Sequence, residues 1–303
     1  MLSSYLGELA ALGAAAVWTI SSLFFTTAGR RVGAFAVNRM RLVFAVLLVG
    51  AAHWLLYGQP FPVEAEGFRY LWLGLSAIVG LVIGDTLLFQ CYVLVGARIG
   101  VLLFVLGPVF GALLAWLFLG EQMAAVELLA MGLVLAGVLW VVLERQVKGQ
   151  ASRADSRNYA LGILMGVGAQ LCQAANLVMS KQGLMGGFSP LSGVMIRMAT
   201  GMIVIWILAM FQGDAGRTIR QVRADARAGW AIFGGAFAGP FVGVWLSMAA
   251  VQAARVGVAT TLMALTPVLS LPLVRWVLKE EISPRAILGT LVAMGGVALM
   301  VLG

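Results

Sequence analysis

The chain has 303 residues, of which 62% are hydrophobic and only 11% charged, and its mean hydropathy is +1.00. A soluble domain of this size needs more polar surface than such a composition supplies, so the sequence excludes a soluble globular protein and predicts one that crosses a membrane several times. The formal net charge of +8 comes mostly from basic residues in short loops between apolar segments. Because basic loops set membrane topology, a nucleic-acid partner is not expected.

Apolar segments long enough to cross the hydrocarbon layer, about 20 residues each, recur along the whole chain. We expect ten of them, with boundaries good to a few residues, at 6–28, 35–57, 70–94, 99–119, 124–143, 159–182, 190–211, 230–252, 257–278 and 285–302. A basic stretch without apolar periodicity separates the fifth from the sixth. We therefore expect a first five-helix repeat over 1–145, a basic linker over 146–158 and a second repeat over 159–303.

The second half of the sequence repeats the first. Pro108 corresponds to Pro267 and Gly137 to Gly296, each pair at the same shift along the chain. Because five is odd, the second copy enters the membrane from the opposite side. We expect an all-α membrane protein with ten transmembrane helices as two inverted five-helix repeats, an arrangement typical of alternating-access transporters.

The two equivalent prolines lie in the middle of the fourth and ninth expected spans. A proline there removes one backbone hydrogen bond of the helix, and the freed carbonyl is tolerated in a membrane only beside other protein or a water-filled cavity. Pro108 and Pro267 are therefore predicted helix breaks in two cavity walls.

One acid lies deep within an expected span. Asp85 is well inside the third span, where a carboxylate costs about 2.5–3.5 kcal/mol on insertion scales, so it should face a cavity or a partner. Phe89 and Tyr92 follow on the same helical face. The alternative is a helix–helix hydrogen bond without transport function. If Asp85 serves transport, we expect Asp85→Asn to insert and fold normally yet transport poorly.

Other polar side chains within the spans are few. Gln173 and Asn176 in the sixth span, and Trp18 in the first, either line a solute path or satisfy one another across helices, and the two readings stay open. The candidate substrate-binding or path-lining residues are Trp18, Asp85, Phe89, Tyr92, Gln173, Asn176, Trp245 and Thr261.

Three arginines fall near or within the second and seventh spans. Arg41 and Arg197 occupy equivalent positions in the two halves, and each either snorkels to the membrane surface or pairs with a substrate carboxylate. For Arg39, snorkelling is the favoured interpretation.

Several motifs together carry a family resemblance. They are the aromatic first span AAAVWTISSLFF, the arginine-containing NRMRL early in the second span, a short ARxG turn, a mid-span proline, and LGE closing the fourth span. In this order the chain resembles the ten-helix EamA-type transporters of the drug/metabolite transporter superfamily. The resemblance implies a carrier in the inner cell membrane that moves small organic solutes, often amino acids, outward by alternating access between its halves. The second copy departs from the pattern, since Lys279 stands where the first has Gly120.

We therefore expect a carrier rather than an enzyme, without a cofactor or a bound metal. Its expected partners are a small-molecule substrate and the lipid bilayer, with a coupled proton and a homo-oligomer left open. The alternatives are an importer, an intramembrane enzyme or a membrane scaffold. An enzyme would need two titratable groups within reach of each other or a metal-ligand set, and the sequence offers one deep carboxylate and no HExxH motif.

The charge distribution predicts an orientation. Most Lys and Arg residues between the expected spans lie on the face opposite both termini, so the positive-inside rule puts the termini outside the cytoplasm. The family resemblance implies the reverse orientation.

Overall fold

The fold is helical throughout the part of the chain that the computed structural model describes, which comprises residues 6–119, 125–147, 153–253, 262–263, 265–277 and 283–302. No strand occurs within these ranges. The first half contains α1 Leu6–Val32, α2 Ala34–Tyr57, α3 Gly67–Ala77, η2 Ile78–Gly84, α4 Asp85–Leu102, η3 Leu103–Val105, α5 Leu106–Leu119 and α6 Ala125–Val147. The second half contains α7 Arg153–Gly183, η4 Met185–Gly187, α8 Pro190–Phe211, α9 Ala215–Ala224, α10 Ala226–Ala236, η5 Phe237–Gly243, α11 Val244–Ala253, α13 Thr266–Val277 and α14 Pro284–Leu302.

Six helical stretches among the described residues are long and apolar enough to cross a membrane, so the chain is a multi-pass membrane protein. They are Leu9–Val32, Ala34–Tyr57, Gly67–Val105, Ser156–Ser180, Pro190–Phe211 and Ala226–Ser247. Two shorter apolar helices, Leu128–Trp140 and Ile287–Leu299, fall in the fifth and tenth expected spans. The full count of ten spans stays a prediction, as do the boundaries of the repeats, and α7 already begins within the stretch expected to be linker.

The long stretch Gly67–Val105 folds back on itself at Gly96. This glycine has φ 86° and ψ 166°, a backbone conformation that L side chains rarely adopt. A side-chain carbon at Gly100 would lie only 2.4 Å from the Tyr92 ring, whereas in a straight helix residues 92 and 100 would be about 12 Å apart along the axis. The third and fourth expected spans are therefore two helices joined by a sharp turn.

Sequence signals at the other turns explain where helices begin and end. Gly33, with φ 83°, separates α1 from α2, and Gly58, with φ 73°, ends α2 while its N–H donates to the Trp54 carbonyl. Ser189 caps α8, which has Pro190 at its first turn. These local rules fix the connections but not the packing of the helices.

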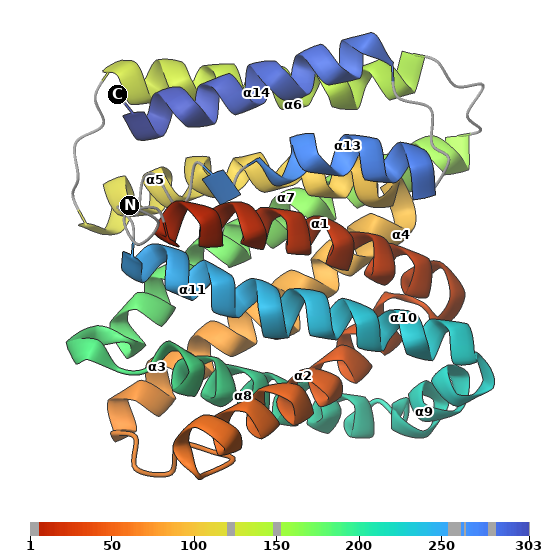
Figure 1. Ribbon diagram of the computed structural model, residues 1–303. Coiled ribbons are helices and arrows are strands. Elements are labelled where there is room, and N and C mark those ends of the chain that lie inside the picture. The colour runs from red at the N-terminus through yellow and green to blue at the C-terminus, as the bar shows by residue number, and fades with distance from the viewer. Residues whose placement is uncertain are drawn as a thin grey trace.

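Helices α6 and α14, the last of each half, pack backbone against backbone (Figure 1). A side-chain carbon at Gly137 would lie 2.6 Å from the Gly289 carbonyl oxygen, and one at Gly296 would lie 2.8 Å from the Ala130 carbonyl oxygen. Gly137 corresponds to Gly296 in the repeat, and Ala130 corresponds to Gly289, so the two contacts are the same contact with the halves exchanged. Such reciprocity defines a contact about a twofold axis, so the repeat seen in the sequence is also a local symmetry of the structure.

The first helix of each half packs on the third span of the other half. Helix α1 contacts α10, η5 and α11, and α7 contacts α3, η2 and α4 in the same manner. In Figure 1, α5 and α13 lie between these helices and the pair α6 and α14, and α1 begins on the same side of the molecule where α14 ends. The two halves are therefore interleaved rather than separate domains.

The outer surface is apolar, as expected for a chain whose solvent is lipid. Leu55 is 85% exposed and Phe211 is 87% exposed. Trp54, Trp230 and Trp276 are also exposed, each near the end of a helix, which is where the aromatic side chains of membrane proteins meet the bilayer surface.

Helix α9 was missed by the sequence analysis because it is too short to span a membrane. It lies in the connection between α8 and α10, with Thr218 and Val222 buried and its arginines exposed. The next turn is tied to the end of α1, where Arg31 Nε donates to Asp225 Oδ2 at 2.6 Å. That hydrogen bond, together with the Ala228 N–H, holds the pKa of Asp225 below its usual range.

A reporter at the C-terminus tests the orientation. In α9, Arg217, Arg220 and Arg223 are exposed, and the turn after α9 contacts Arg31, so these residues lie on the same side of the membrane, as the charge count assumed. By charge alone, a green fluorescent protein fused after Gly303 should stay dark and an alkaline phosphatase fused there should be active. A fluorescent, phosphatase-inactive fusion would put the termini in the cytoplasm, as the family resemblance implies.

Candidate functional site

A π-helical segment positions the one deep carboxylate. Segment η2 ends at Gly84, directly before Asp85, and wide helical turns of this kind occur frequently at functional sites. Two glycines of η2 let α7 approach closely: a side-chain carbon at Gly80 would lie 2.7 Å from Cγ of Asn176, and one at Gly84 would lie 2.9 Å from Cβ of Cys172. The polar side chains of α7 therefore reach the level of Asp85.

Asp85 pairs with Arg41 of α2. The guanidinium donates to Asp85 Oδ2, and both residues are buried, with Arg41 3% and Asp85 8% exposed. Arg41 Nε also donates to Asn38 Oδ1 at 2.9 Å, and Asn38 Nδ2 in turn donates to the Leu81 carbonyl at 2.9 Å. The pair is thus held on one side by α2 and on the other by the carbonyls of η2.

Two aromatic rings pack against the Arg41 guanidinium. Its central carbon lies 5.0 Å from the Phe89 ring centroid and 6.0 Å from that of Phe25. The two rings are themselves in contact, with centroids 4.8 Å apart. Cation–π attraction of this kind strengthens when the charge is desolvated, so Arg41 is held in a fixed place beside the carboxylate.

The amides of α7 extend the network from Asp85 to the second half of the chain. Gln173 Nε2 donates to Asp85 Oδ1 at 2.9 Å, and Asn176 Nδ2 donates to Gln173 Oε1 at 2.7 Å. The guanidinium of Arg197, on α8, donates to Asn176 Oδ1. We call Arg41, Asp85, Gln173, Asn176 and Arg197 the central network. It joins side chains from α2, α4, α7 and α8.

The equivalent position in the other half has no carboxylate. Segment η5 matches η2, and the residue that follows it is Val244, the counterpart of Asp85. There Trp18 of α1 packs over Gly243 and donates from Nε1 to Ser247 Oγ at 3.3 Å. The two halves therefore share the π-helical backbone segment but differ in the side chain that follows it.

The structure groups some of the candidate residues and separates others. Asp85, Gln173 and Asn176 lie in the central network, and Phe89 packs on it. Tyr92 is only 2% exposed and packs beneath the turn at Gly96. Trp18 lies at the pseudo-equivalent position, while Trp245 is 43% exposed and contacts Phe241 with its ring tilted, outside the central network.

The remaining candidates concern the fourth and ninth spans. Pro108 lies in the first turn of α5, directly after the 3-10 turn η3, and Pro267 lies in the first turn of α13. The regular α-helix is interrupted by η3 just before Pro108, and α13 begins one residue before Pro267. Thr261 lies outside the described residues.

Sequence reasoning missed the partners of Asp85. It left Arg41 and Arg197 between snorkelling and substrate binding, and it did not connect either with the deep acid. A usable signal was present, because buried charges pair and the chain has one deep acid with two repeat-related arginines. Arg39 reaches the connection between α8 and α10, where it donates to Thr218 Oγ1 at 2.9 Å, but α9 covers it and it is only 4% exposed.

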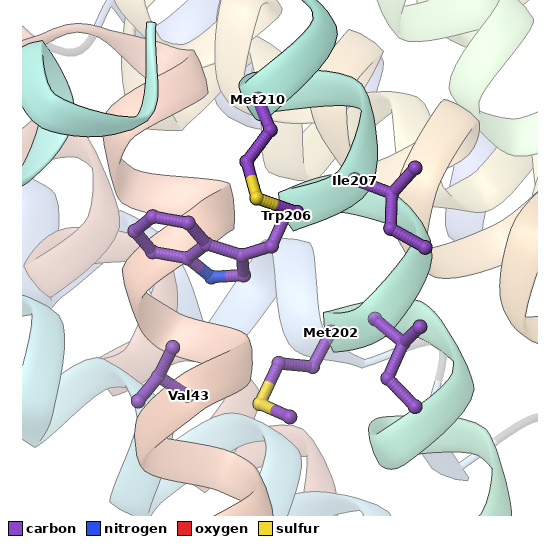
Figure 2. A pocket seen from close by; sticks show the side chains of 6 residues that line it. Val43, Met202, Trp206, Ile207 and Met210 are labelled. Atoms are coloured by element: carbon purple, nitrogen blue, oxygen red, sulfur yellow. The ribbon is translucent and has the colours of Figure 1, made fainter.

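A surface groove lies apart from the central network, between α2 and α8. Figure 2 shows Trp206 and Met202 of α8 facing Val43 of α2 along it, and Met210 and two isoleucines of α8 complete its lining. Trp206 Nε1 donates to the Arg39 carbonyl at 3.2 Å, which leaves the ring face in the groove. The groove is apolar and open to the outer surface, where acyl chains of the bilayer lie.

Buried ionised side chains between membrane helices are typical of membrane transport proteins, and the interleaved helical halves belong to the same class. Residues 5–143 and 160–302 each match the EamA-like transporter family, so the chain belongs to that family and is a membrane transporter of small solutes. One solved structure, titled only as a crystal structure of a protein, aligns with a TM-score of 0.65 at 17% identity, over 97% of this chain and 95% of its own. That likeness concerns the fold alone. No curated protein matches the chain.

Proposed function

We propose that the chain exports small organic metabolites, amino acids among them, across the inner cell membrane. Ten spans in two inverted five-helix repeats would let it alternate between two states open to opposite sides. The two repeats would meet at the central network, which then serves as the substrate site.

The central network is the observation that carries this proposal. Charged groups cost free energy within a membrane and are retained there mainly for function. Here they join α2 and α4 of the first half to α7 and α8 of the second, so a solute bound among them contacts both halves. A rearrangement of one half against the other would change the access to that solute.

Two features support a rearrangement at this place. The π-helical segments η2 and η5 occupy equivalent positions, and each carries glycines against the first helix of the other half. Wide helical turns occur often at functional sites, and small residues let helix backbones approach closely, so these segments are suitable places for one half to move against the other. The prolines in the first turns of α5 and α13 add two more places that lack a regular backbone hydrogen bond.

Metabolite export tests the proposal. In cells that overproduce the chain, one class of amino acid or related metabolite should accumulate in the medium and fall inside the cell, and cells lacking it should show the reverse. Inside-out membrane vesicles should take up the same solute. A rise in cellular uptake instead would make the chain an importer, and no flux in either direction would contradict a carrier.

A further inference from the structure

The central network holds an unbalanced charge. Arg41 and Arg197 occupy equivalent positions in the two halves, and both are at least nine-tenths buried. Asp85 is the carboxylate of the network, and its ion pair is with Arg41. Among the described residues, the electrostatic neighbours of Arg197 are this same carboxylate and the like-charged Arg41. Two guanidinium groups thus share one carboxylate.

Arg197 is the less satisfied of the two arginines. Its terminal nitrogen donates to the Asn176 side-chain oxygen, which is neutral, and its Nε is buried without a hydrogen-bond partner. Asn176 is itself held by Gln173 and by Ser180, whose hydroxyl donates to it at 3.4 Å. Arg197 therefore has a neutral amide as its direct hydrogen-bond partner and only a share of the Asp85 charge, and the group that suits a guanidinium best is a planar carboxylate.

We propose that Arg197 receives the carboxylate of the transported solute, so that the substrates are small organic acids, amino acids included. This rests on the proposed function of the chain as a carrier with its site at the central network. The bound carboxylate balances the network, with two cations facing two anions. Arg41 stays with Asp85, packed beside Phe25 and Phe89, and serves as the fixed part of the site.

An amino acid fits the same arrangement through its second charge. Arg41 donates to Asp85 Oδ2, whereas Oδ1 accepts a hydrogen bond from Gln173. A substrate ammonium can replace that amide on Oδ1 while the carboxylate lies on Arg197. A simple acid uses Arg197 alone. An amine without a carboxylate would leave Arg197 uncompensated and add another positive charge.

Three probe molecules that carry the same side chain but different charged groups separate these cases. We would reconstitute the purified full chain in liposomes and measure uptake of labelled leucine, of isocaproate, which lacks the amino group, and of isoamylamine, which lacks the carboxylate, together with the corresponding triads of the other amino acids. In the wild-type protein, we expect flux of acids or amino acids to exceed flux of the matching amines at least about tenfold, the loss typical of one charge-assisted hydrogen bond. Equal or faster flux of the amines would overturn the role of Arg197 while leaving a carrier, whereas no flux of any probe would contradict the proposed function itself.

Variants of Arg197 give the second arm of the experiment. In Arg197→Gln, acid flux should fall about tenfold or more relative to amine flux. Arg197→Lys should keep the preference for acids but with a raised KM, because an ammonium keeps the positive charge and loses the paired N–H groups that bind a carboxylate. The control is Arg39→Gln, which removes another buried arginine that lies under α9 and outside the central network. An unchanged acid-to-amine ratio in folded Arg197→Gln would sink the proposal. If that variant does not fold, the wild-type comparison of acids with amines still decides.

Discussion

Asp85→Asn is expected to lower both the stability and the transport activity of the protein. The substitution removes the counter-ion of Arg41 and leaves a buried guanidinium unpaired, which typically costs about 3–5 kcal/mol. The sequence alone led us to expect that this variant folds normally. Because Asp85 pairs with Arg41, we now expect a less stable variant. Thermal unfolding in detergent, followed by loss of monodisperse protein, measures the first effect, and solute flux in liposomes measures the second.

A double variant separates folding from transport. In Arg41→Gln combined with Asp85→Asn, both charges are gone and amide groups remain to hydrogen-bond, so we expect much of the stability to return while transport stays impaired. The matched control is Asp214→Asn, since the Asp214 side chain is 43% exposed and lies 3.8 Å from Arg39, a geometry worth about 0–1 kcal/mol. Full transport by the double variant would show that the pair only supports packing.

Gly137→Ala is expected to separate α6 from α14. The added methyl carbon would lie 2.5 Å from the Ala293 amide nitrogen and 2.6 Å from the Gly289 carbonyl oxygen, and backbone atoms do not move aside as a flexible side chain can. The helices must shift apart, with a loss of about 1–3 kcal/mol typical of overpacked sites. The same thermal unfolding assay would detect this loss, and Gly296→Ala should reproduce it from the other helix.

Gly132→Ala on the same helix is the matched control. A methyl carbon there meets no atom within 4 Å, and alanine favours a helix over glycine by about 1 kcal/mol. We therefore expect Gly132→Ala to leave stability unchanged or to raise it, whereas Gly137→Ala lowers it. If both substitutions have the same effect, the close contact of α6 with α14 does not form in the membrane.

The central network shows how far sequence reasoning reaches. Asp85, Gln173 and Asn176 were candidates because polar groups within apolar segments are costly and therefore informative. Their connection was not predicted, because hydrogen bonds between Asp85 and Gln173 depend on which faces of α4 and α7 meet. Likewise Trp18 and Trp245 were placed on the same path as Asp85, and the packing puts Trp18 at the pseudo-equivalent position and Trp245 on the outside.

The sequence by itself determined that the protein lies in a membrane, that its two halves are a duplication, and which family it belongs to. Each of these three is a property of composition or of order along the chain, and none of them requires knowledge of what lies opposite a given side chain. Only the tertiary structure decided that Arg41 neutralises Asp85, that Arg197 remains uncompensated and that η2 and η5 are π-helical. The reason is physical: in a membrane all the helices are apolar, so hydrophobic periodicity hardly distinguishes their faces, and close approach at particular glycines selects which polar groups meet.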